Sequence, residues 1–145
     1  MLEIYVSRME CLSLRIRSRL ACAAEPYMGK RERDSLLRDA EKDIGKIEED
    51  PHIWPRANAA LFRACVASVR GEKDLARTML ERAERSYAAA DMEVHTGVAR
   101  IRLGQLLGGA RGAEVKAEGE SRLAAQNIKS PEKVARMFAP GRWDS

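Results

Sequence analysis

The sequence contains little of what a β-sheet needs. Only 16 of its 145 residues are the β-branched Val, Ile and Thr, and 5% are aromatic. Strands of sandwiches and barrels are rich in both types, so the composition excludes these folds. Proline is also scarce, at 5 residues, which allows long helices to run without interruption.

Long uncharged apolar runs and paired cysteines are missing as well. The first 24 residues carry charges throughout, so they predict neither a signal peptide nor a spanning helix. The three cysteines, Cys11, Cys22 and Cys65, form no C-x-x-C pair. Cys11 and Cys22 would lie roughly 16 Å apart along one helix, too far for a disulfide. We expect a cytoplasmic protein with reduced thiols and no membrane partner.

Helix formers are what the sequence has in abundance. Ala, Leu, Glu, Lys and Arg make up 76 of the 145 residues, a share typical of long helices or helical arrays. The net charge is +4, and acidic and basic residues alternate along the chain, which does not favour a nucleic-acid-binding face. Arg8, Arg15 and Arg19 keep nucleic acid as a minor alternative, although no recognition helix follows them.

Turn residues divide the chain into seven expected helices. They cover residues 2–24, 30–49, 55–70, 72–90, 92–107, 112–126 and 131–138. We expect one all-α domain over residues 1–145, with hairpins at about 2–50, 54–90 and 92–127 and a capping helix with its tail at 130–145. Val134, Met137 and Phe138 predict the inner face of the capping helix, and Trp143 is expected to pack beyond it.

Similar residues recur at spacings near 40. Leu37, Ala40 and Ile44 recur 43 positions later as Leu80, Ala83 and Tyr87. Ala76 and Ala83 recur 41 positions later as Ala117 and Ala124, and Ala64 recurs 40 positions later as Gly104. Such spacing predicts a helical solenoid in which small residues lie at close helix contacts. An ordinary up-down bundle is the alternative.

The segment from Asn58 to Ala90 resembles a tetratricopeptide-like repeat. The residues that carry the resemblance are Leu61, Ala64, Gly71, Ala76, Leu80 and Ala83, and a second copy contains Leu103, Gly104, Ala117, Ala124 and Pro131. Both copies are longer than the usual 34 residues and lack the early Trp and the Tyr of the family. The resemblance implies an α–α superhelix of about three hairpins plus a capping helix, whose first helices line a concave binding face.

The ending from Pro131 to Trp143 is similar to the tail of repeat regions that follow serine/threonine kinase domains in GC-rich bacteria, especially myxobacteria. The sequence contains no glycine-rich phosphate loop, H-R-D or D-F-G motif of its own. The similarity therefore implies a regulatory or scaffolding part of a bacterial signalling protein.

The family resemblance places seven residues on the concave face, where we expect them to contact a protein or peptide partner. They are Asn58, Leu61, Cys65, Ser68, Val98, Ile101 and Gln105. In some relatives a Lys and an Asn at such positions clamp the C-terminal carboxylate of a chaperone. Leu61 and Cys65 stand there in this sequence, which disfavours that ligand. A structural or dimerising element of a larger signalling protein is the alternative function.

Enzyme chemistry has little support in the sequence. Neither His52 nor His95 belongs to a metal-binding or nucleophile–base pattern, and Cys65 has no activating neighbour along the chain. The glycine-rich stretch 104–112 lacks the Gly-Lys-Ser/Thr ending of a phosphate loop. We expect no catalytic activity, cofactor, metal or small-molecule substrate.

Overall fold

The computed structural model describes residues 2–144, and within this range the chain is all-α, as the composition predicts. The helices are α1 (Leu2–Ala24), α2 (Lys30–Glu48), α3 (Ile53–Arg70), α4 (Lys73–Ala89), α5 (Glu93–Leu107), α6 (Gly109–Ala125) and α7 (Pro131–Phe138). Met1 and Ser145, the two ends of the expected domain, lie outside the described residues.

Two helices begin earlier than the sequence indicates. α3 starts at Ile53, and Pro55 lies within its first turn, where a missing N–H breaks no helical hydrogen bond. α6 starts at Gly109 instead of Gly112, because the turn after α5 is short and is made by Gly108 and Gly109, with φ of 66° and 61°. Gly71 ends α3 in the left-handed conformation at φ of 78°, which glycine adopts without strain.

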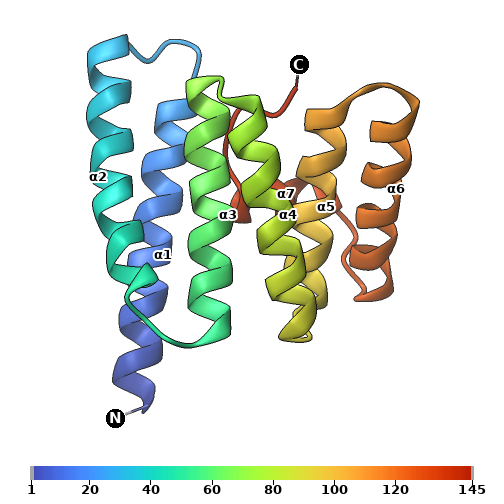
Figure 1. Cartoon of the computed structure of the whole chain (residues 1–145), viewed down its shortest axis with the longest axis horizontal. Coiled ribbons are helices and arrows are strands. Elements are labelled where there is room, and N and C mark those ends of the chain that lie inside the picture. The colour runs from blue at the N-terminus through green and yellow to red at the C-terminus, as the bar shows by residue number, and fades with distance from the viewer. Residues whose placement is uncertain (1, 145) are drawn as a thin grey trace.

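The helices form three antiparallel hairpins that pack side by side in chain order, which is the arrangement of an α–α superhelix (Figure 1). The pairs are α1–α2, α3–α4 and α5–α6, and α4 joins the second hairpin to the third by packing on α5. α3 packs on α1, α2 and α4, so most of its side chains are buried. The hydrophobic core therefore runs through α3 from one hairpin to the next.

The α5–α6 hairpin is held by glycines that face one another. A Cβ atom on Gly104 would lie 2.5 Å from the carbonyl oxygen of Gly112, and one on Gly119 would lie 2.7 Å from that of Gly97. No side chain fits between the two backbones at these points. Four glycines, otherwise poor helix formers, therefore allow these helices to approach closely.

The repeat spacing is correct for one pair of helices and wrong for another. Leu37, Ala40 and Ile44 of α2 and their counterparts Leu80, Ala83 and Tyr87 of α4 are all buried. Ala117 and Ala124, the expected counterparts of Ala76 and Ala83 in α6, are exposed instead. Gly112 and Gly119 take the buried positions 36 residues after Ala76 and Ala83. The buried positions follow the helix starts, because α6 begins at Gly109, 36 residues after α4 begins at Lys73.

The C-terminal helix does not lie where the sequence predicts it. α7 packs mainly on α5 and lies on the face formed by α1, α3 and α5, instead of capping the end of α6 (Figure 1). Val134 and Phe138 are half-buried, but Met137 is exposed. Ala135 is the buried residue of the helix, and Trp143 is buried beyond it as expected. The chain therefore folds back across its own first helices after α6.

Candidate protein-binding groove

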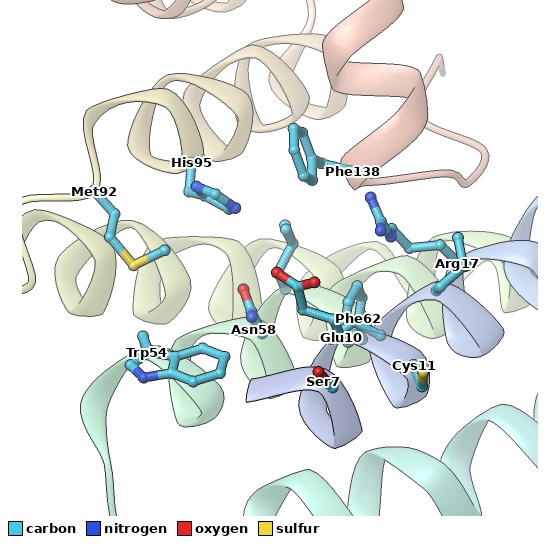
Figure 2. A pocket seen from close by; sticks show the side chains of 13 residues that line it. Ser7, Glu10, Cys11, Arg17, Trp54, Asn58, Phe62, Met92, His95 and Phe138 are labelled. Carbon is cyan, nitrogen blue, oxygen red and sulfur yellow. The ribbon is translucent and has the colours of Figure 1, made fainter. Parts of the chain in front are cut away.

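A groove of about 570 Å³ opens on the α1–α3–α5 face, the surface formed by the first helix of each hairpin (Figure 2). We call it the open groove. The residues that line it come from α1, α3, α7 and the beginning of α5, and none comes from α2, α4 or α6. They are Ser7, Glu10, Cys11, Ser13, Leu14, Arg17, Trp54, Asn58, Leu61, Phe62, Met92, His95 and Phe138. Most of these side chains are apolar or aromatic, a lining suited to apolar groups of a partner.

Aromatic rings form the wall of the open groove next to α7. The ring centroid of His95 lies 5.0 Å from that of Tyr87 and 4.8 Å from that of Phe138. Arg17 places its guanidinium carbon 5.2 Å from the centre of the Phe138 ring, on the side opposite His95 (Figure 2). The cation over the ring and the tilted ring pairs are both attractive contacts, and together they fix Phe138 against α1 and α5.

Three polar side chains, His95, Tyr87 and Asn58, lie in or beside this wall. Burial is the main cause that lowers the pKa of His95 below its usual 6.5, and the positive charge of Arg17 lowers the same pKa further. The hydroxyl of the buried Tyr87 donates a hydrogen bond to the amide oxygen of Asn58. His95 is therefore neutral at pH 7, and Asn58 is oriented before any ligand arrives.

Only part of the predicted set of seven residues is accessible. Asn58 and Gln105 are half-buried, and Asn58 and Leu61 line the open groove. For five of the seven residues, the prediction of an accessible position on the concave face is wrong. Leu61, Cys65, Ser68, Val98 and Ile101 are buried. The reason is that α3 and α5 are each covered by neighbouring helices on several sides, so little of their surface remains for a partner.

The chain itself covers the remainder of the α1–α3–α5 face. Residues 131–144, which we call the C-terminal segment, lie across the face and contact each of its helices. The guanidinium of Arg102 in α5 donates from Nε to the carbonyl of Ala139, at 3.0 Å. The backbone N–H of Arg142 donates to the hydroxyl of Ser68 in α3, at 3.1 Å, and its side-chain Nε donates to the carbonyl of Ala24 in α1, at 3.2 Å.

Most of the groove residues that sequence reasoning missed lie on α1 and α7, and the others are Trp54 and Phe62 of α3 and Met92 and His95 at the start of α5. Leu14 of α1 is 59% exposed and Phe138 of α7 forms a wall. The sequence placed α7 at the end of the array, and no local signal showed that it would turn back. Apolar residues of α1 lie at buried positions such as Leu12 and at exposed positions such as Leu14, and their types alone do not separate core positions from groove positions.

The basic cluster on α1 is occupied by an internal carboxylate. Arg15 donates two hydrogen bonds to Asp43 of α2, at 2.8 and 2.7 Å, and Arg19 donates one at 2.6 Å. These interactions, with that of Arg15 the largest, hold the pKa of the buried Asp43 below its usual 3.8. Two of the three arginines of the nucleic-acid alternative therefore serve to join α1 to α2.

Cys65 is buried, whereas Cys11, Cys22 and His52 are exposed. Burial raises the pKa of Cys65 to about 12, so its thiol is protonated at neutral pH. His52 lies beside Asp50, with 2.7 Å between Nδ1 and a carboxylate oxygen, and Asp50 also accepts a hydrogen bond from Tyr5. Within residues 2–144, no group of three His, Cys, Asp or Glu side chains could hold a metal ion.

Comparisons with known proteins leave the groove as the main guide to function. No protein-family model matches the chain, and neither a curated protein nor a solved structure matches it. Among the described helices, none combines the length and apolarity needed to cross a bilayer.

Proposed function

We propose that the chain is a non-catalytic protein-interaction module that binds a protein or peptide in the open groove. The observation that carries this proposal is the apolar groove of about 570 Å³ on the α1–α3–α5 face. First helices line the ligand-binding face in tetratricopeptide-like arrays, which the segment Asn58–Ala90 resembles. A groove of this size takes a few side chains of a partner, so binding by this chain alone is weak, on the order of micromolar.

The setting we propose is bacterial signalling. The basis is the similarity of the sequence from Pro131 to Trp143 to the tails of repeat regions that follow serine/threonine kinase domains. On this proposal the chain works in the cytoplasm as a scaffolding or regulatory part, without a cofactor or small-molecule substrate. Partner proteins captured from the host, including any kinase, test this setting.

A pull-down from the native host tests the groove. Leu14→Glu places a charge in the open groove at an exposed position, so the fold tolerates it and the partner is lost. Leu75→Glu is the matched control, because Leu75 is 46% exposed on α4, outside the groove. Changes at Leu61 and Ile101 would be less informative, since both side chains are buried. Retention of the same partners by the Leu14 variant would refute the groove assignment.

Exposed apolar residues at the start of α1 favour a second candidate function, a structural or dimerising element. Leu2 and Ile4 are both 73% exposed in the first turn of this helix. Side chains of this kind form contacts between copies when they gather in one patch. Light scattering decides between the two: a stable dimer that Ile4→Glu converts to a monomer would support this function.

A further inference from the structure

The C-terminal segment lies on the α1–α3–α5 face in the manner of a bound ligand. It touches α1, α3 and α5 through separate hydrogen bonds, and its contacts fall on residues far away in the sequence. Phe138, at the end of α7, also forms one wall of the open groove. The segment and the open groove thus divide a single surface between them.

We propose that this face is a docking surface for a chain segment made of a short helix followed by Pro-Gly-Arg-Trp, and that the chain's own C-terminal segment is its resident occupant. A partner segment of the same chemistry displaces it. The inference rests on the proposed function, because it names the kind of partner that the same face receives and how access to the face is controlled.

A buried arginine and a tryptophan provide the first recognition element. The carbonyl oxygen of Ala139 accepts hydrogen bonds from Arg102 Nε and from Trp143 Nε1, each at 3.0 Å. The guanidinium carbon of Arg102 lies 5.7 Å from the centre of the Trp143 ring. Arg102 also donates to Gln105 of its own helix at 2.8 Å, and the acceptor and the ring that the segment supplies complete the partners of this buried cation.

The end of α1 provides the second element. Arg142 donates from Nε to the carbonyl of Ala24 at 3.2 Å and from a terminal nitrogen to that of Glu25 at 3.5 Å. The last carbonyls of a helix lack partners within the helix and carry partial negative charge, so an arginine from a docked segment suits them. An aspartate or glutamate at this position of a partner would be rejected.

The turn before Arg142 favours glycine. A Cβ atom on Gly141 would lie 2.4 Å from the hydroxyl oxygen of Ser68 and 2.9 Å from Nε1 of Trp143. The same Ser68 hydroxyl accepts the backbone N–H of Arg142. The face therefore favours glycine before the arginine by shape, while the carbonyls at the end of α1 favour the arginine by charge.

The connection between α6 and the C-terminal segment allows the segment to leave the α1–α3–α5 face. α7 has eight residues, too few for a helix to be stable without packing, and the connection at residues 126–130 contains no buried residue. A tethered occupant acts at an effective concentration on the order of millimolar. A free segment of equal intrinsic affinity therefore binds the intact chain with an apparent Kd near that value, and binds much more tightly once the resident is unseated.

A labelled peptide of residues 130–144, followed by fluorescence anisotropy, tests this competition on the full chain. Gly141→Val and Trp143→Ala each unseat the resident segment by a different route, and Lys133→Ala on the exposed side of α7 is the control. We expect both unseating variants to bind the peptide at least about tenfold more tightly than the wild type. The control variant should match the wild type.

Two results would overturn the proposal. One is equal affinity of the peptide for the wild type and for both unseating variants. The other is loss of cooperative helical unfolding in both variants, which would make the segment part of the core instead of an occupant. The peptide-binding test and the partner-capture test of the proposed function can fail independently. Loss of peptide binding with partner capture retained refutes only this inference, whereas the reverse result refutes only the partner site at Leu14.

Discussion

At the scale of single residues, the buried carboxylate of Asp43 is met by opposite charges. The side chain of Asp43 is 3% exposed and is neutralised by Arg15 and Arg19 from α1, while Lys46 lies farther away at 3.5 Å. Because a hydrogen bond to a charged group contributes about 1.5–3 kcal/mol, Asp43→Ala should lower the free energy of unfolding by about 2 kcal/mol.

Urea denaturation measures this change, and Lys46→Ala is its control. Lys46 is exposed, so its removal should alter the free energy of unfolding by less than about 0.5 kcal/mol. Equal stability of the Asp43 variant and the wild type would show that the α1–α2 contact does not depend on this carboxylate.

His95 gives a prediction on pH. Its pKa is lower in the folded chain than the usual 6.5, so between these two values the unfolded chain binds more protons. The free energy of unfolding should therefore fall as the pH falls below about 6.5, and His95→Gln should remove this part of the decrease. Thermal denaturation between pH 7 and pH 5 measures both profiles, and parallel profiles would contradict the assignment.

At the scale of elements, the close approach of α5 and α6 depends on glycine. Ala is normally the better helix residue by about 1 kcal/mol, but a Cβ on Gly104 would lie 2.5 Å from the backbone nitrogen of Lys116. Gly104→Ala should therefore destabilise the fold by about 1–3 kcal/mol. Gly45→Ala in α2, where a Cβ meets nothing within 4 Å, should stabilise it by about 0.5–1 kcal/mol. The opposite signs in chemical denaturation are the test.

The packing of α4 and α6 gives a second prediction for elements. Ala83 is fully buried in α4, so Ala83→Leu should cost about 1–3 kcal/mol through overpacking. Ala124 is exposed in α6, so Ala124→Leu should change stability by less than about 0.5 kcal/mol. Melting temperatures compare the two variants; equal losses would restore the 41-residue spacing that the structure contradicts.

At the scale of the whole molecule, the chain carries a net charge of only +4 and an apolar open groove. Binding of the captured partner should change by less than about threefold between 50 and 200 mM salt, because few ion pairs are screened. A protein that contacts 6–10 phosphates would lose roughly 10³–10⁵ in affinity over the same range. A titration at both salt concentrations checks this, and a steep loss would revive the nucleic-acid alternative.

The sequence by itself determined the local structure. The periodicity of apolar residues and the breakers at Gly71 and Gly108 predicted all seven helices and the hairpin order, because helix formation and termination depend on neighbours within a few residues. It also predicted the buried match between α2 and α4, where two long helices with similar apolar spacing follow similar turns.

Only the tertiary structure decided which helical faces remain open. Cys65 and Val98 looked like groove residues, yet they are buried because α3 and α5 are each surrounded by several elements. The path of residues 131–144 was equally invisible, since it depends on contacts such as that between Arg142 and Ala24, 118 residues apart. A period along one helix reports that a face is apolar; whether a neighbour or solvent covers it is fixed by distant parts of the chain.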